Sequence, residues 1–578
     1  MPSFVNYKGN RVYQPSVLVD VNNNLISPEA LGGKALLVVG DFPILQQNKP
    51  HTFTSIGGLE LADVYPKDVT LRNIDKIWKS ALKDSSAVAE SITYLNARPT
   101  TAASHSIVDE ATSGVSLVEL KSVNFGDLGN DYQYNIQGPS EDASLNVDGN
   151  FYKFTFRQPG EDDVEIKRGY PKQIKVTGTN LGVLEIKDDA DGDPAIVYAG
   201  AAGGNANDLA SRKLSSFATL SEVVDYLNTS AELTVVQQGF DVSPIGLDEM
   251  AKTFGAADLV VSLHGHSQAL IDAINELSSI PLDASYQEAL RKPLRQDNVY
   301  YNLTGGTAAV APTQANYRDA LQVMVNKDIT SMTLMSDVAA NHDAVAAHLA
   351  LASQAGRERN AWLPAQGNMS LSDIGDTYVS PQNNQLISIC GQGISYLDYQ
   401  GNVRVEAHPM WQAIALMCLQ GALPAAEPLT RKLPNIVDTS EAWTREDDVN
   451  EAIKRGIVVV GLGLSNDLRV ERSVTTWRND QESFNTEVSC RESVNTCLRE
   501  LRKFLDGELG GKILNSTVGR LLNLSENRLK QLRDAGIIQD FANVKVRRVT
   551  DTVFVDFDLA AVEPLNFIRI TANLVREV

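Results

Sequence analysis

Two consecutive runs toward the C-terminal side of the sequence alternate between apolar and polar residues. In the first run every second residue is apolar: Val553, Val555, Phe557 and Leu559. The second run follows Pro564 and has apolar residues at the same spacing: Ile568, Ile570, Ala572 and Leu574. Because side chains on a strand point alternately to its two faces, each run predicts a strand with one apolar face. Such a strand can pair within its own domain or complete an open sheet edge in another copy of the protein, and the pattern permits both.

The N-terminal residues predict an extended arm rather than a domain. Residues 11–21, RVYQPSVLVDV, form a short β-prone run. Pro15 interrupts this run, because proline cannot donate a hydrogen bond to a strand ladder. We therefore assign residues 1–22 to an N-terminal arm and, by the argument above, residues 561–578 to a C-terminal arm.

An α/β pattern, in which apolar strands are followed by amphipathic helices, begins after the N-terminal arm. Residues 35–39 predict a buried strand that ends in a turn at Gly40, and a second strand is expected near residues 91–97. The helix between them has an apolar face formed by Ile74, Ile77, Trp78, Ala81 and Leu82. We expect residues 23–103 to form the first part of an α/β core.

The same pattern returns over residues 239–450, which we expect to complete the core. A first helix there has one apolar face, formed by Leu270, Ile271, Ile274 and Leu277. Residues 341–359 predict a second helix that leads into a strand at residues 361–363. Residues 410–421 predict a largely buried helix, which Pro424 prevents from continuing.

Between the two parts of the core, the pattern changes to short alternating runs separated by Gly, Asn and Asp. Examples are residues 151–156 and 174–176. Short runs with turn residues at regular spacing are typical of all-β domains. Residues 104–238 are therefore expected to form an inserted, β-rich outer domain.

The last domain, residues 451–560, is expected to be α+β. Its long helix has apolar residues at helical spacing: Val494, Cys497, Leu498, Leu501, Phe504 and Leu505. A later helix at residues 525–535 is followed by Gly536, at the position where a glycine commonly ends a helix. The alternating β runs come next.

Composition indicates a large, acidic, globular protein. A chain of 578 residues fits about three or four domains. Its net charge of -21 disfavours binding to nucleic acid or to an anionic membrane surface. Four cysteines indicate a reducing compartment rather than a disulfide framework. Because the sequence starts with polar residues and its apolar runs are too short to span a bilayer, we expect cytoplasmic synthesis and no membrane insertion.

Candidate motifs for phosphate and metal binding are incomplete. GGK at residues 32–34 lacks the frame of a phosphate-binding loop, and GLGLS at residues 461–465 lacks the third glycine of a dinucleotide fingerprint. We interpret both as turns at strand ends. A calcium loop is imitated by Asp188, Asp189, Asp191 and Asp193. Because Gly192 is misplaced and no glutamate closes the loop, a solvated hairpin is favoured.

The histidines and cysteines show no catalytic or metal-binding arrangement. No ligand spacing relates His264, His266, His342 and His348. Cys490 and Cys497 lie beside the apolar stripe of the long helix, which indicates core thiols rather than nucleophiles. No Gly-Thr-Ser nucleophile context occurs, so we expect no hydrolase triad. Because the ligand spacings and the phosphate and dinucleotide motifs are incomplete, we also expect no metal and no cofactor.

Five segments occur in an order that is characteristic of one protein family. They are ARPTTAA with Arg98, NFGDLGNDYQYNIQ, the pair Gly456-Ile457, residues 472–476, and VFVDFDLAAVEPLNFIRITANL. In this order and texture the chain resembles the contractile tail sheath proteins of myovirus-type bacteriophages. The N-terminus departs from the family pattern, because Val12 and Tyr13 precede Pro15 and the family's Pro-Gly pair is absent.

The resemblance implies a mixed α/β and β multidomain fold with a subtilisin-like α/β core. It implies a structural protein, not an enzyme, that polymerises as stacked hexameric rings around a tail tube. Contraction of such a sheath drives the tube through the host envelope during genome delivery. The implied partners are the tail tube, baseplate and tail terminator proteins, and the implied location is the virion tail, after assembly in the host cytoplasm.

The resemblance also implies that the two arms are exchanged between copies, and the pattern above fits this. The arm residues expected to take part are Val12, Tyr13, Val17, Val19, Phe567, Ile568, Ile570 and Leu574. A near alternative is the sheath of a phage-derived bacteriocin or extracellular injection device. The distant alternative is an α/β hydrolase with a β accessory domain, which requires a Ser or Cys, a His and a carboxylate within hydrogen-bond reach.

Overall fold

The computed structural model describes most of the chain, which divides into two compact units. Unit 1 comprises Met1–Phe42, Gln47–Pro99 and Val310–Val578, and unit 2 comprises Pro43–Gln46 and Thr100–Ala309. The described residues are 5–7, 10–12, 25–26, 34–54, 68–83, 89–108, 116–140, 151–168, 172–177, 182–200, 208–238, 250–253, 259–263, 266–277, 279–286, 294–295, 299–308, 310–406, 408–432, 434, 436–439, 443, 446–462, 467–511 and 516–566. Among the described helices, none is long and apolar enough to cross a lipid bilayer.

Unit 1 is built on an eight-stranded sheet with the order β29-β28-β24-β23-β22-β4-β6-β5. The six strands from β28 to β6 are parallel, and the two outer strands are antiparallel to their neighbours. The strands are β4 (Lys34–Gly40), β5 (Pro50–Thr54), β6 (Ala89–Asn96), β22 (Ser331–Leu334), β23 (Asn360–Pro364), β24 (Ile387–Cys390), β28 (Ile457–Leu462) and β29 (Leu468–Arg472). Strands buried on both faces require apolar residues at consecutive positions, as in the run Ala35 to Val39.

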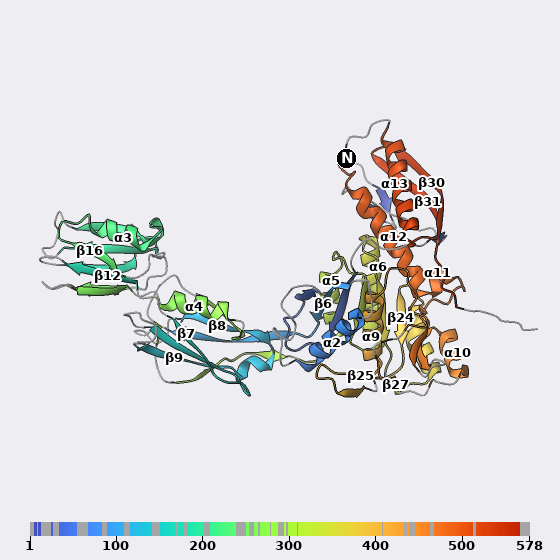
Figure 1. Cartoon of the computed structure of the whole chain (residues 1–578), viewed down its shortest axis with the longest axis horizontal. Helices are drawn as coiled ribbons and strands as arrows, with labels where there is room; N and C mark the ends of the chain where they lie inside the picture. The colour runs from blue at the N-terminus through green and yellow to red at the C-terminus, as the bar shows by residue number, and fades with distance from the viewer. Residues whose placement is uncertain are drawn as a thin grey trace, which may run out of the picture. The chain divides into compact units, whose positions relative to one another are not determined.

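Helices cover both faces of this sheet (Figure 1). On one face, the apolar core joins the sheet to α5 (Gln314–Val323), α6 (Ala339–Gln354), α7 (Leu371–Ile374) and α10 (Glu446–Arg455). On the other face lie α2 (Val69–Lys83) and α9 (Met410–Ala422). Every residue of α9 after Met410 is buried. Gly421 allows its close approach, because a Cβ there would lie 2.9 Å from the methyl groups of Leu36.

The other helices and strands predicted for the core are confirmed, with one shorter helix, whereas the helix predicted around Leu270 to Leu277 lies in unit 2. α6 ends at Gln354 instead of residue 359. Gly356 follows with a φ of 74°, a left-handed conformation that ends the helix and leads the chain into β23. A small separate sheet in this unit contains β25 (Ile394–Leu397), β26 (Val403–Glu406) and β27 (Asp438–Thr439).

Within its described residues, unit 2 contains four antiparallel sheets and two apolar cores. The first core lies under α4 (His266–Glu276). Its strands are β7 (Thr100–Val108), β8 (Ser116–Phe125), β9 (Gln133–Ser140), β10 (Phe151–Arg157), β11 (Val164–Arg168), β19 (Leu282–Tyr286), β20 (Tyr301–Asn302) and β21 (Thr307–Ala308). The second core lies under α3 (Leu220–Leu227). The other two sheets contain β12 (Lys172–Thr177), β13 (Val183–Asp188), β14 (Pro194–Ala199), β15 (Leu209–Lys213), β16 (Thr234–Gln238), β17 (Met250–Thr253) and β18 (Leu259–Leu263).

The expected boundary of the inserted domain at residue 238 differs from the boundary in the structure. Strands β17, β18 and β19 pair with β13, β12 and β8, which all lie within residues 104–238. Helix α4, assigned above to the core, packs on the first β core of unit 2 through Leu270 and Ile274. The inserted unit therefore extends to Ala309. An apolar stripe predicts that a helix packs on a sheet but does not identify the sheet.

The C-terminal part of unit 1 packs two helices on a small sheet. These elements are α12 (Val488–Asp506), α13 (Thr517–Asp534), β30 (Asp540–Val549) and β31 (Thr552–Ala560). Gly536 has a φ of 70° after α13, so the predicted glycine end is confirmed. Phe504 was expected on the apolar stripe of α12, but it is 38% exposed and faces the guanidinium of Arg528 instead.

Candidate assembly surface

The C-terminal sheet has two outer strands, β3 and β30, each of which has an edge without a described partner. β31 lies between β30, which is antiparallel to it, and the short parallel strand β3 (Leu25–Ile26). The N-terminal part of the chain therefore adds a strand to the C-terminal sheet. Within the described residues β30 pairs with β31 alone, so its outer edge presents backbone N–H and C=O groups to an incoming strand.

The two faces of β31 differ as the alternation predicted. Its apolar residues pack against α12 and α13, and they are Val553, Val555, Phe557 and Leu559. On the opposite face, the Asp556 carboxylate lies 3.2 Å from Arg547 of β30, and Asp558 accepts a hydrogen bond from Asn543. The predicted first strand is thus confirmed, and its apolar face completes the domain's own core.

One of the eight predicted arm residues is described. Val12 ends β2 (Asn10–Val12) and pairs with Val5 of β1 (Val5–Tyr7) in an antiparallel hairpin. The other seven lie outside the described residues: Tyr13, Val17, Val19, Phe567, Ile568, Ile570 and Leu574. Their part in assembly remains a prediction.

Helix α12 joins the C-terminal domain to the core sheet, and its two sides contact different partners. Its apolar side contacts α13 and the C-terminal sheet through Val494, Cys497, Leu498, Leu501 and Leu505. Its polar side carries Glu492, Asn495, Arg499 and Arg502. These polar side chains contact the segments at which β4, β22 and β23 begin. We call this contact the polar joint.

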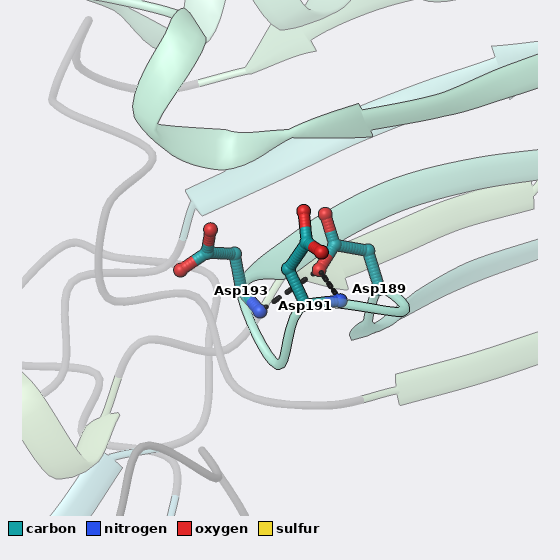
Figure 2. Close-up of side chains that lie close together, drawn as sticks. All are labelled: Asp189, Asp191 and Asp193. Carbon is teal, nitrogen blue, oxygen red and sulfur yellow. Dashed lines mark hydrogen bonds between the residues drawn. The ribbon is translucent and has the colours of Figure 1, made fainter.

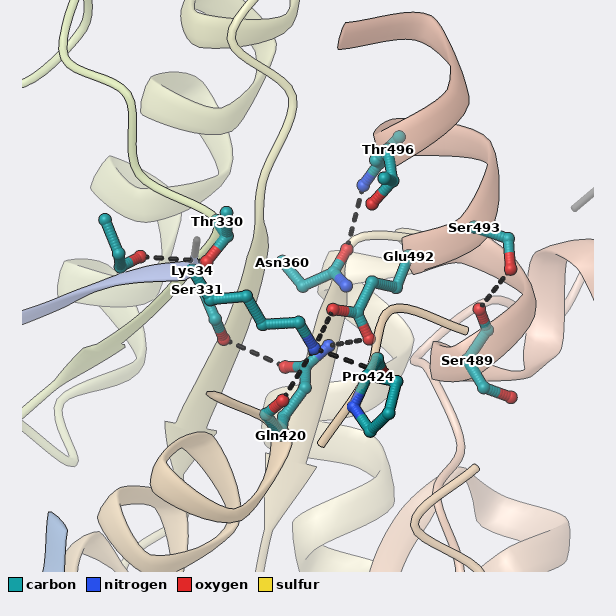
Figure 3. Close-up of polar contacts among 12 residues, drawn as sticks. Lys34, Thr330, Ser331, Asn360, Gln420, Pro424, Ser489, Glu492, Ser493 and Thr496 are labelled. Carbon is teal, nitrogen blue, oxygen red and sulfur yellow. Dashed lines mark hydrogen bonds and ion pairs between the residues drawn. The ribbon is translucent and has the colours of Figure 1, made fainter. Parts of the chain in front are cut away.

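Lys34 lies at the centre of the polar joint (Figure 3). Its ammonium is 2.5 Å from Glu492 and donates to the carbonyl oxygens of Gln420 and Pro424, at 2.7 and 3.4 Å. Burial lowers the pKa of Lys34, and the adjacent Glu492 carboxylate opposes this shift. The lysine of the GGK motif is thus buried and ion-paired at the start of β4, and the two glycines lie outside the described residues.

The Gln420 side chain connects this ion pair to the core. Its Oε1 accepts hydrogen bonds from Ser331 Oγ at 2.9 Å and Trp362 Nε1 at 2.7 Å, and its Nε2 donates to Glu492 at 3.1 Å. Gln420 is on α9, so one amide links two strands and two helices. A buried amide with donor and acceptor both paired stabilises one relative orientation of these elements.

A second ion pair lies further along α12. Arg502 contacts Glu358 through both terminal nitrogens, at 3.1 and 3.0 Å, and also donates to the carbonyl oxygen of Gly356. Arg499 donates to the carbonyl oxygens of Ile329 and Glu358 at 3.4 and 3.3 Å. The polar joint was not predicted from the sequence. The feature of the sequence that could have indicated the joint is the helical spacing of the four polar residues on α12, opposite its apolar stripe.

The acidic loop of unit 2 forms the solvated hairpin that was predicted, between β13 and β14. Asp189 accepts hydrogen bonds from the backbone N–H groups of Asp191 and Asp193, at 2.9 and 3.0 Å (Figure 2). Lys213 lies within 3.5 Å of all three carboxylates, and their hydrogen bonds raise its pKa. The protein's own ammonium therefore occupies the place a cation would take.

The histidines lie in separate environments. Burial lowers the pKa of His342 to about 4 and that of His348 to about 3, where the adjacent Arg359 adds to the effect. His266 is the first residue of α4, and His264 lies outside the described residues. Among the described residues, the acidic loop is the one set of three potential metal ligands that lie close together.

Two features bear on the hydrolase alternative: the environment of the cysteines, and a histidine, His408, that lies beside a carboxylate. Cys490 and Cys497 are buried, and burial raises the pKa of both thiols to about 12. This agrees with core thiols. His408 Nε2 lies 3.0 Å from Asp337, and its Nδ1 accepts the backbone N–H of Met410 at 3.2 Å. Both ring nitrogens of His408 are therefore engaged, and within the described part of the chain neither has a hydroxyl or thiol as its partner.

Comparison with known proteins identifies relatives of one kind. No protein-family model matches the chain. It is 20% identical over 366 residues to the tail sheath protein of Bacillus phage SP01, which covers 62% of each chain. It is 23% identical over 275 residues to the tail sheath protein of Mycobacterium phage Bxz1, covering 46% of this chain and 47% of the relative. Both matches span less than two thirds of the relatives' own length.

The fold is similar to solved structures over nearly the whole chain. The sheath tail protein of Desulfitobacterium hafniense matches with a TM-score of 0.52 at 13% identity, covering 95% of this chain and 98% of the other. The sheath tail protein of Listeria innocua matches with a TM-score of 0.52 at 10% identity, covering 92% and 96%. The resemblance inferred from the sequence is thus confirmed, since in sequence and in fold this chain is similar to tail sheath proteins.

Proposed function

We propose that this chain is the structural subunit of a contractile sheath around a tail tube. The observation that carries the proposal is the C-terminal sheet, which already takes a strand from the N-terminal region and has an open edge at β30. A sheet of this kind can accept a strand from a second copy. Heterologous contacts of that kind do not close on themselves and produce an open helix.

Contraction in this proposal is a change of packing between copies. Subunits stack as hexameric rings in a long metastable state and re-pack into a shorter, wider and more stable one when the baseplate triggers them. The stored free energy lies in contacts between subunits, so the mechanism requires no nucleotide. The partners are the tail tube, baseplate and terminator proteins, and the chain resides in the virion tail.

In this proposal the parts of the chain take different positions in the sheath. Residues 451–560 face the tube, the inserted unit lies on the outside, and the arms, with Val12, Tyr13, Val17, Val19, Phe567, Ile568, Ile570 and Leu574, pass between copies. The core sheet is the part for which the resemblance implies a subtilisin-like shape. The sheath of a phage-derived bacteriocin or injection device uses the same features and is the second candidate.

Electron microscopy of the purified full chain tests the proposal. We expect rings or long hollow tubes at high protein concentration. Light scattering over a range of salt and protein concentrations provides the opposing result, because a strictly monomeric species throughout would contradict a sheath function.

A further inference from the structure

The described chain continues past the C-terminal sheet as a short segment, residues 562–566, which we call the stem. The stem lies against the beginning of α12 and the short helix α11 (Ser483–Thr486). The Val562 carbonyl oxygen accepts from the Cys490 thiol at 3.4 Å, and Glu563 accepts from Ser483 Oγ at 2.5 Å. Asn566 Nδ2 donates to Glu487 Oε1 at 3.0 Å. The stem is thus attached at three successive points.

Glu487 is itself held by the core sheet. Its side chain is 1% exposed, and its Oε1 lies 2.5 Å from Nε of Arg472, the last residue of β29. The backbone adds further bonds, because Val488 donates to Ser473 at 3.2 Å and Thr475 donates to Thr486 at 2.9 Å. Charge-assisted hydrogen bonds to a buried carboxylate are stronger than neutral ones. The last contact of the stem therefore leads directly to the edge strand of the eight-stranded sheet.

The stem and the C-terminal sheet both contact α12, but the stem also reaches α11 and β29. β31 ends at Ala560 and packs on α12 and α13 through Leu559 and Phe557. Past that point, the stem bonds to α11, to the first turn of α12 and, through Glu487, to β29. Leu565, between these attachments, is 78% exposed.

We propose that the Asn566–Glu487–Arg472 chain of bonds anchors the C-terminal arm to the core sheet. A pull on residues 567–578 by a neighbouring copy then acts on β29, and it bypasses the sheet formed by β30 and β31. The C-terminal sheet can then bind a strand from a neighbouring copy while the force on residues 567–578 is transmitted to β29 and not to β30 and β31. This inference rests on the proposed function, because it assigns the load to a neighbouring subunit.

The anchor can be tested on the full chain without assembly. A spin label on Leu565→Cys reports the mobility of the stem, and the four native cysteines are all buried, so the new thiol is the accessible one. We expect the spectrum of the spin label in this parent protein to show restricted motion. After Asn566→Ala or Glu487→Gln, we expect the label to move several-fold faster. The matched control is Asn527→Ala, on the exposed side of α13, which should leave the spectrum unchanged.

Two results would overturn the anchor: a label that is already mobile in the parent protein, or one whose motion neither substitution alters. The second arm of the experiment uses assembled tubes. Asn566→Ala tubes are expected to lose subunits on contraction several times more often than Asn527→Ala tubes, and equal loss would contradict the load path. If the chain builds no tubes at all, the proposed function fails, whereas the spin-label result still decides whether the stem is anchored.

Discussion

The Lys34 ammonium and the Glu492 carboxylate form an ion pair 2.5 Å apart, with side chains 8% and 6% exposed. Removing one partner leaves the other charge buried and uncompensated. We expect Lys34→Met or Glu492→Leu alone to lower the free energy of unfolding by about 3 to 5 kcal/mol, and the double variant to recover much of this loss. Urea unfolding of the four proteins gives the coupling energy. Effects that simply add would show that the pair is not coupled.

Acid should weaken unit 1 through His348. Its folded pKa of about 3 lies below the ordinary value of 6.5, because burial and Arg359 disfavour its charged form. The unfolded chain therefore takes up the proton first. The stability contributed by neutral His348 is complete above about pH 6.5 and is lost as the pH falls toward 3.

The measurement is the melting temperature of wild type and His348→Gln between pH 7 and pH 5. Glutamine can accept the hydrogen bond from Arg359 but does not titrate, so we expect the variant to lose less stability over this interval. His342, with a folded pKa of about 4, supplies part of the remaining slope. Parallel curves for the two proteins would show that His348 does not titrate on unfolding.

Calcium should have no effect on the hairpin that carries Asp189, Asp191 and Asp193. Lys213 already pairs with these carboxylates. We expect millimolar Ca²⁺ to leave the melting of the wild-type chain unchanged. Because the ion pairs are exposed, Lys213→Ala should change the melting temperature little. A calcium-dependent rise in wild-type melting temperature would contradict this assignment.

The boundaries of unit 2 predict which deletion is tolerated. Ala308 pairs with Thr100, so the two chain ends of the unit lie side by side and a short Gly-rich linker can join them. Residues 43–46 also belong to unit 2, so their apolar side chains Ile44 and Leu45 would lose their packing and are replaced as well. We expect replacement of residues 101–307 by the linker, together with Ile44→Gln and Leu45→Gln, to leave a soluble unit 1. Deletion of residues 104–238 should instead aggregate, because it leaves β17, β18 and β19 without partners. Size-exclusion chromatography distinguishes the two outcomes, and equal solubility would contradict the assigned boundary.

The arm prediction is tested by Ile570→Pro. Proline removes one backbone donor, so a strand added to a neighbour at this residue should not form. We expect tube assembly to be blocked with little change in the melting temperature of the monomer. Normal tubes from this variant would exclude donation by this segment. An unfolded monomer would show that the strand belongs to its own domain.

The sequence predicted local elements better than long-range partners. Periodicity located α9, α12 and the alternating faces of β31, because each depends on neighbouring residues. It placed α4 in the wrong unit, since an apolar stripe is the same whichever sheet it covers. The polar joint was missed for a related reason. The spacing of Glu492, Asn495 and Arg499 is the same for a helix side that faces water and for one that faces a second domain.

The order of strands in the core sheet has a consequence for synthesis on the ribosome. β4 pairs with β22, and all of unit 2 is encoded between them. At about 5 to 20 residues per second, β4 waits about 15 to 60 s for this neighbour. During that interval β4 can pair with β6 only, so one edge of a strongly apolar strand stays open while unit 2 folds. A nascent-chain chaperone that covers β4 would therefore be most useful before Ser331 emerges.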